Sequence, residues 1–161
     1  MGRCGNAMTI VASLRRILLA EDSPHDAELT IEALSENHLT NTIDHVRDGA
    51  EALDYLYRRG AFSKREKGNP SVILLDLKMP KMDGLEVLRQ IRGDAQMKAI
   101  PVVIMTSSRE EQDLVRSYEL GVNAYVVKPV EFGGFVEAVK QVGVFWVMLN
   151  ELPTQVAENP R

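Results

Sequence analysis

The stretch Val72–Gly84, with the sequence VILLDLKMPKMDG, decides the fold class of this chain. It begins with four consecutive aliphatic residues followed by Asp76, and such a short apolar run is typical of a buried β-strand. After a proline-containing loop, the pair Asp83-Gly84 opens a segment in which leucine and isoleucine recur every three residues. Because this is the period of an amphipathic helix, the stretch predicts a strand followed by a helix.

The same alternation of apolar runs and helical patterns continues through the chain. Near-continuous apolar strands are needed where helices cover both faces of a sheet. We therefore predict an α/β fold with a doubly wound, five-stranded parallel sheet of order 2-1-3-4-5 and five helices. The other expected strands are Ile17–Ala20, Thr42–Val46, Val102–Met105 and Tyr125–Val127, and the other expected helices begin near Ser23, Asp48, Ser108 and Glu131, the last running to Asn150.

Length and composition narrow the class of protein. The chain has 161 residues, close to the roughly 150 residues of one domain. We expect an N-terminal tail over 1–15, one domain over 16–150 and a C-terminal tail over 151–161, with no attached output domain. A net charge of −4 disfavours nucleic acid and anionic membranes as partners. The single cysteine, Cys4, and the lack of an apolar run of about 18 residues favour a cytoplasmic location.

Acidic residues follow two strands that are neighbours in the predicted sheet. Glu21 and Asp22 come after the first strand, and Asp76 ends the third. Because ligands of an open parallel sheet bind beyond the carboxyl ends of its strands, we expect the three carboxylates in one crevice. Clustered carboxylates repel one another unless a cation lies among them, and an all-oxygen ligand set suits Mg²⁺. Taken singly, each acid is also compatible with a solvated loop or a helix N-terminus.

Two more polar side chains are expected at this edge of the sheet. Thr106 ends the fourth strand and Lys128 ends the fifth. A carboxylate beside a bound metal ion can attack a phosphoryl group, and a hydroxyl and an ammonium group stabilise the charge on the phosphoryl oxygens. A turn threonine and a solvated lysine are the alternatives for each residue alone. The coincidence of these groups at successive strand ends favours metal-assisted phosphoryl chemistry.

Four motifs in this chain resemble the signatures of a known family. In order and spacing they are similar to those of response-regulator receiver domains of two-component signalling, and the resemblance extends over about residues 16–149. It implies the flavodoxin-like receiver fold. The motifs are ILLAEDSP at 17–24, VILLDLKMPKMDG at 72–84, IPVVIMTSS at 100–108 and AYVVKP at 124–129.

The resemblance implies a phosphorylation site that contains Mg²⁺. Asp76 matches the phosphoacceptor of the family, and Glu21 and Asp22 match the acids that bind the metal ion with it. The backbone carbonyl of Lys78 matches a further metal ligand.

The resemblance also implies a switch. Thr106 matches the hydroxyl that binds the phosphoryl group, and Lys128 matches the lysine that pairs with it. Tyr125 matches the aromatic residue that turns inward on activation, although an exposed aromatic residue of a β-strand is the alternative. The peptide bond before Pro129 is commonly cis in the family, as the energetics of such bonds permit.

The connection before the third strand is longer than is usual for receivers. Between Arg58 and Asn69 it holds five basic residues and one acid, Glu66. A solvated loop is the simpler interpretation, and a docking element for a partner is the alternative. Together with the segment SYELGVNAY at 117–125 and the pair Phe145-Trp146, this loop resembles small regulators that pair with phytochrome-type sensor histidine kinases.

The last predicted helix carries an unusually wide apolar surface. Val144–Leu149 is a run of six apolar residues, whereas a surface helix needs only one apolar stripe. Cover by the C-terminal tail is one interpretation. Because receivers commonly dimerise through their fourth helix, fifth strand and fifth helix, we instead expect a homodimer through the corresponding segments near 108–120, 125–127 and 131–150.

Three functional hypotheses follow. The leading one is a single-domain response regulator, not an enzyme, which accepts a phosphoryl group on Asp76 from a sensor histidine kinase, slowly dephosphorylates itself and signals through protein contacts. The alternative is a Mg²⁺-dependent phosphohydrolase with an aspartyl nucleophile. Such enzymes usually carry a second acid two residues after the nucleophile, where this chain has Lys78. A binding module without chemistry is disfavoured because all five active-site side chains are present.

Overall fold

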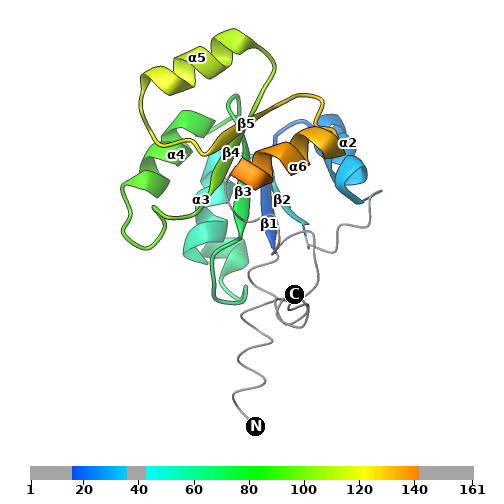
Figure 1. The fold of residues 1–161 in the computed structure, drawn as a ribbon. Helices are drawn as coiled ribbons and strands as arrows, with labels where there is room; N and C mark the ends of the chain where they lie inside the picture. Colours follow the sequence, from blue (N-terminus) through cyan, green and yellow to red (C-terminus); the bar gives the residue numbers. More distant parts are fainter. Residues whose placement is uncertain (1–15, 36–42, 142–161) are drawn as a thin grey trace, which may run out of the picture.

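The computed structural model describes residues 16–35 and 43–141, which form one sheet with helices on both sides (Figure 1). Neighbouring strands are parallel and follow the order β2-β1-β3-β4-β5, which confirms the predicted order. The predicted tails, 1–15 and 151–161, lie outside the described residues. The strands are β1 (Ile17–Ala20), β2 (Ile43–Val46), β3 (Val72–Asp76), β4 (Val102–Thr106) and β5 (Ala124–Val127).

The helices begin where capping residues predict. The side chains of Asp48, Asp83 and Ser108 each accept a hydrogen bond from the backbone N–H three residues later. Residues 142–150 of the last predicted helix lie outside the described part of the chain. None of the described helices is long and apolar enough to span a bilayer. The elements are α2 (Pro24–Ser35), α3 (Gly49–Tyr57), the 3₁₀-helix η1 (Gly60–Phe62), α4 (Gly84–Arg92), α5 (Arg109–Ser117) and α6 (Phe132–Gln141).

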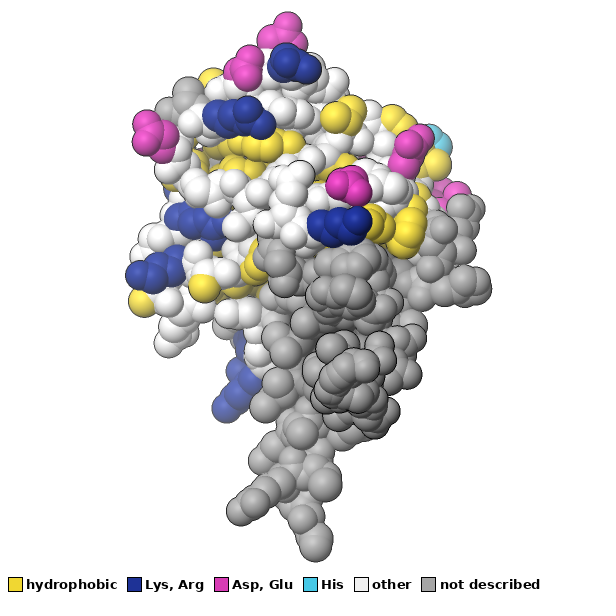
Figure 2. Space-filling model, viewed as in Figure 1, with side chains coloured by type: hydrophobic (Ala, Val, Ile, Leu, Met, Phe, Trp, Pro, Cys, Tyr) yellow, Lys and Arg dark blue, Asp and Glu magenta, His cyan; other side chains and the backbone are white. Residues whose placement is uncertain are grey.

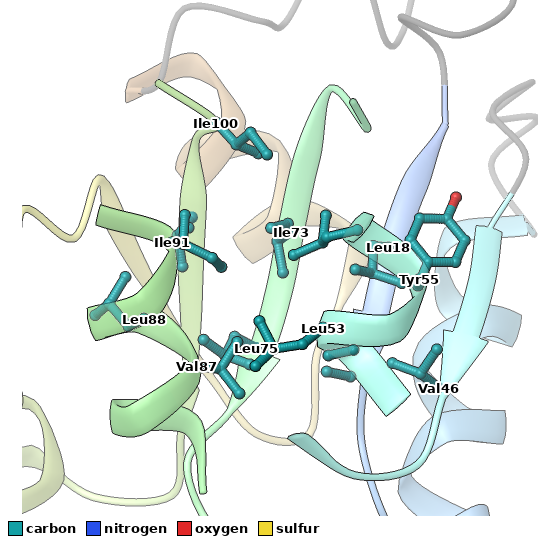
Figure 3. Packing of buried hydrophobic residues seen from close by; sticks show 14 of the residues in the cluster. Leu18, Val46, Leu53, Tyr55, Ile73, Leu75, Val87, Leu88, Ile91 and Ile100 are labelled. Atoms are coloured by element: carbon teal, nitrogen blue, oxygen red, sulfur yellow. The ribbon is translucent and has the colours of Figure 1, made fainter. Parts of the chain in front are cut away.

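Each face of the sheet has its own apolar core. Side chains of successive strand residues point to opposite faces, so Ile73 and Leu75 pack under α3 and α4, whereas Val72 and Leu74 pack under α2 and α6. Figure 3 shows the first of these cores, with Leu53, Val87 and Ile91 directed toward the strands. Burial on both faces explains why the strands are apolar along their whole length.

The long basic connection between α3 and β3 is organised by its own arginine. The Arg65 guanidinium lies 4.1 Å from the centroid of the buried Tyr55 ring, and its Nε donates to the Tyr55 carbonyl at 2.9 Å. The same guanidinium donates to the carbonyls of Glu66 and Gly68. Part of the positive charge expected between Arg58 and Asn69 therefore holds the loop against α3.

Arg92, at the end of α4, links two loops at the end of the sheet where the strands begin. The Arg92 guanidinium donates to the carbonyls of Lys98 and Ile100 in the loop before β4. It also donates to the Gly121 carbonyl and, at 2.9 Å, to Asn123 Oδ1 in the loop before β5. Asn123 Oδ1 in turn accepts a hydrogen bond from the backbone N–H of Val102, the first residue of β4.

Candidate phosphoryl-transfer site

Three carboxylates meet at the carboxyl ends of β1 and β3. Because these strands are neighbours, Glu21 and Asp22 after β1 lie next to Asp76 at the end of β3. One oxygen from each carboxylate can be chosen so that all three lie within 4.8 Å of one another. Glu21 and Asp76 are buried, and Asp22 is exposed. The predicted acidic cluster is therefore present as a compact group of oxygen ligands.

Glu21 is fixed by the edge strand beside it. Its backbone N–H donates to the Val46 carbonyl at 3.0 Å, and its own carbonyl lies 2.8 Å from His45 Nε2. Its carboxylate accepts a hydrogen bond from the backbone N–H of Ser23 at 3.2 Å. His45 was not predictable as part of this site, because a single histidine in a strand leaves no pattern in the sequence.

Lys128 is the cation at the centre of the cluster. Its Nζ lies 3.1 Å from Glu21 Oε1 and 3.3 Å from Asp76 Oδ1. It also lies 3.5 Å from Asp26 Oδ2, in the first turn of α2, a contact that the sequence did not predict because the two residues are far apart in the chain. The peptide bond between Lys128 and Pro129 is cis, as the resemblance implies.

The electrostatics of the cluster favour the arrival of positive charge. Burial and the neighbouring negative charge of Asp76 raise the pKa of Glu21 to about 7. Burial lowers the pKa of Lys128, but the charges of Asp76 and Glu21 outweigh this effect and raise it. The lysine therefore stays protonated while one acid resists ionisation. Buried carboxylates that are destabilised in this way and offer only oxygen ligands fit the requirements of Mg²⁺.

Thr106 presents a hydroxyl group with no internal partner. It is fully buried at the end of β4, beside Asp76, whose partner in the strand register is Met105. Among the described residues, its Oγ1 is the buried side-chain oxygen or nitrogen that has no hydrogen-bond partner. Leaving such a group unsatisfied costs on the order of 1–3 kcal/mol, so this hydroxyl is suited to a ligand that reaches the site.

The loop after Asp76 is held tightly by a glycine. The backbone N–H of Leu77 donates to Asp76 Oδ1 at 2.9 Å, and the N–H of Gly84 donates to the Leu77 carbonyl at 2.9 Å. A Cβ atom at position 84 would lie 2.3 Å from the Asp76 carbonyl oxygen, so only glycine allows this approach. The turn between β3 and α4 thus fixes the position of the acceptor carboxylate.

Two other predicted residues lie around this centre. The Lys78 side chain is 84% exposed, and its Nζ lies 3.6 Å from Glu111 Oε2 on α5; the predicted metal-ligand role of its backbone carbonyl stays a prediction. Tyr125 is half-buried and packs against the core under α5, on the same face of the sheet as Ile104. The Arg116 guanidinium lies 4.8 Å from the centroid of its ring.

Comparison with known proteins agrees with this geometry. Residues 17–140 match the family described as the response regulator receiver domain. Response regulator Rcp1 of Synechocystis sp. (strain ATCC 27184 / PCC 6803 / Kazusa) is 40% identical over 141 residues, which cover 85% of this chain and 92% of that protein. A solved Mn²⁺-bound form of Rcp1 is 37% identical, with a TM-score of 0.66 over 86% of this chain and 99% of that one.

Two further solved structures are similar. The bacteriophytochrome response regulator AtBRR is 60% identical, with a TM-score of 0.81 over 86% of this chain and 99% of its own. The phosphorylated cyanobacterial phytochrome response regulator RcpA is 38% identical, with a TM-score of 0.67 over 87% of this chain and 99% of its own. The match over residues 17–140, the parallel sheet and the acidic cluster lead to one conclusion: this chain belongs to the response regulator receiver domain family.

Proposed function

We propose that this chain receives a phosphoryl group on Asp76 from a sensor histidine kinase and transmits that event through the surface formed by α5, β5 and α6. The observation that carries the proposal is the convergence at one sheet edge of three carboxylates, the Lys128 ammonium and the unpartnered Thr106 hydroxyl. No single one of these groups requires phosphoryl chemistry, but together they supply a nucleophile, a fixed cation and a hydrogen-bond donor.

Mg²⁺ is the metal ion that suits this site. Glu21, Asp22 and Asp76 would hold it, together with the backbone carbonyl of Lys78, because Mg²⁺ prefers oxygen ligands and keeps several waters. When bound, it would neutralise negative charge on the phosphoryl oxygens. The related protein Rcp1 has been solved in a Mn²⁺-bound form, which supports the binding of a divalent cation by this chain.

The transfer step is a displacement at phosphorus. A carboxylate oxygen of Asp76 forms a bond to the phosphorus of a phosphohistidine, the P–N bond breaks, and the imidazole leaves with the electron pair and takes up a proton. The resulting aspartyl phosphate carries more negative charge than the carboxylate. Lys128, whose Nζ is already 3.3 Å from Asp76 Oδ1, balances that charge.

The switch begins at Thr106. Its hydroxyl gains a hydrogen-bond acceptor when a phosphoryl group occupies the site, and this favours a conformation in which β4 and the start of α5 move toward Asp76. Tyr125, on the strand beside β4, follows into the space under α5. The shift is a change of population that is driven by contacts present only in the phosphorylated state.

The partners are proposed on surface composition and on the relatives. Leu114 on α5, Tyr118 just after α5 and Val127 on β5 are exposed by 51%, 44% and 58%, so the α5–β5 surface presents apolar side chains. Figure 2 shows hydrophobic side chains at the surface near α5, among side chains of both charges. We propose homodimerisation through α5, β5 and α6; the apolar run Val144–Leu149 lies outside the described residues. The similarity to AtBRR and RcpA supports a phytochrome-type kinase as the donor.

The proposal is tested by phosphorylation with a small donor. With acetyl phosphate and MgCl₂, the unsubstituted chain should gain one phosphoryl group by intact-mass spectrometry, and the Asp76→Asn variant should gain none. Asp94→Asn is the matched control, because Asp94 pairs with Tyr57 far from the cluster and its replacement should leave uptake unchanged. Stable uptake of one phosphoryl group by Asp76→Asn would show that the nucleophile is another residue.

A further inference from the structure

We propose that Arg116 is a positioning residue that holds Tyr125 in its resting place and so opposes activation; this inference rests on the proposed function. The guanidinium of Arg116, in the last turn of α5, lies over the ring of Tyr125 on β5, with 4.8 Å between its central carbon and the ring centroid. The contact links α5, the helix that is expected to move, with Tyr125, the residue that is expected to follow it.

Tyr125 lies beside the part of β4 where a signal from the site would arrive. In the strand register Tyr125 is opposite Ile104, and Thr106 is opposite Val127. Partners in register share a face, and residues two apart on a strand share a face, so Thr106 and Tyr125 lie on the same side of the sheet on adjacent strands. A displacement of Thr106 therefore changes the space that is available to the Tyr125 ring.

A hollow lies beside the Tyr125 ring, and the Arg116 guanidinium lies over the ring. A hollow of about 340 Å³ lies between the end of α5 and β5, and its lining includes Arg116, Leu120, Val122 and Tyr125. The ring is half-buried, so part of its surface faces solvent and this hollow. The exposed Arg116 guanidinium contacts the ring in its half-buried position. In the proposed switch, a ring that turns inward beneath α5 moves away from this guanidinium.

The Arg116–Tyr125 contact is strong enough to shift the equilibrium between the resting and activated conformations. A guanidinium over a tyrosine ring at an exposed site favours the stacked state by an amount that corresponds to about a two- to fivefold change in population. An interaction present in only one state shifts the equilibrium by its full differential strength. Loss of Arg116 should therefore increase the activated population about two- to fivefold in the absence of a phosphoryl group.

The experiment uses the beryllofluoride–Mg²⁺ complex as a mimic of the phosphoryl group on the full chain. Arg116→Ala should bind it about two- to fivefold more tightly than the unsubstituted chain, because more molecules already occupy the activated conformation. Removal of a positive charge would by itself weaken the binding of this anion, so tighter binding cannot come from simple electrostatics. Unchanged or weaker binding by Arg116→Ala overturns the inference.

The matched control is Arg59→Ala. Arg59, just after α3, lies over the ring of Tyr57 at the same distance, 4.8 Å, but that ring is not on β5, so the loss of Arg59 should not tighten binding. In a chain that carries Tyr125→Leu, the Arg116→Ala substitution should no longer tighten binding, since there is no ring to hold. An effect of equal size in that background also overturns the inference.

A spectroscopic readout separates positioning from simple stabilisation. In chains labelled with 3-fluorotyrosine, the ¹⁹F resonance of Tyr125, assigned through Tyr125→Phe, should move in Arg116→Ala toward its position in the beryllofluoride-bound chain. A resonance that stays at its resting position contradicts the inference. If the unsubstituted chain itself fails to bind the mimic, the proposed function falls, and this inference falls with it.

Discussion

Replacement of Thr106 by valine is expected to make the chain more stable to unfolding, unlike most substitutions in a protein core. Thr106 is fully buried, and its Oγ1 has no partner among the described residues. Valine has nearly the same shape, so it leaves no cavity, and it removes a hydroxyl group that loses its hydrogen bond to water on folding. The gain in the free energy of unfolding should be about 1–3 kcal/mol, the cost of one unsatisfied buried polar group.

A second threonine in the same chain provides the matched control. Thr30 on α2 is also buried, but its Oγ1 donates to the Asp26 carbonyl at 2.9 Å. The Thr30→Val substitution removes a hydroxyl that has a partner, so it should give no gain and a loss of up to about 1 kcal/mol. Each variant replaces one buried hydroxyl group by a methyl group, and the expected effects on the free energy of unfolding have opposite signs.

The assay is urea unfolding followed by circular dichroism, without divalent cations. For Thr106→Val the midpoint should move to higher urea with an unchanged slope, and the melting temperature should rise by roughly 2–4 °C for each kcal/mol. If Thr106→Val unfolds at lower urea than the parent, as Thr30→Val is expected to do, then the Thr106 hydroxyl is already satisfied in the resting chain. That result would refute the reasoning that assigns its partner to the phosphorylated state.

Two further predictions concern stability at the two edges of the sheet. Because the pKa of Glu21 is raised to about 7 from its ordinary value of 4.5, the folded chain binds more protons than the unfolded chain between these pH values, and stability falls as the pH rises through this window. In urea unfolding without metal ions, Glu21→Gln should gain stability relative to the parent from pH 4.5 to about pH 7 and no more above it; a constant difference would contradict the assignment. At the other edge, the Tyr55 hydroxyl donates to Asp44 at 2.5 Å, so Tyr55→Phe should lower the free energy of unfolding by about 1–2 kcal/mol. The control Tyr57→Phe removes an exposed hydrogen bond to Asp94 and should change the free energy of unfolding by less than about 0.5 kcal/mol. Equal losses of stability in the two variants would show that burial does not strengthen the Tyr55 hydrogen bond.

The strands and their order followed from simple physics. A sheet covered on both faces needs apolar residues along each strand, so runs such as Val72–Leu75 and Val102–Met105 stand out in the sequence, and the order 2-1-3-4-5 is confirmed. The helix starts were equally visible, because Asp48 and Ser108 satisfy backbone N–H groups that helix geometry leaves unpaired.

The contacts between distant side chains were not predictable in the same way. Lys128 and Asp26 are far apart in the chain, and their pairing depends on the first turn of α2 facing the end of β5. The placement of Arg65 on Tyr55 and of Arg116 on Tyr125 likewise depends on rotamers and helix orientation, which leave no period in the sequence. The sequence identified the residue types of the site, and tertiary packing decided which of them touch.

The hydrogen bonds of Arg92 have a consequence for the opposite end of the molecule. Through the loops before β4 and β5, one guanidinium fixes where both strands start, and Asn123 completes the link to the first residue of β4. A strand advances about 3.3 Å per residue, so the ends of β4 and β5 lie roughly 13–17 Å from this anchor. In the register of these strands Thr106 lies opposite Val127, next to Lys128, and Arg92 holds the loops where both strands begin. A lysine at position 92, with one nitrogen in place of three, could not reach both loops. Part of the precision of the phosphorylation site is thus determined at the edge of the sheet that never meets the phosphoryl group.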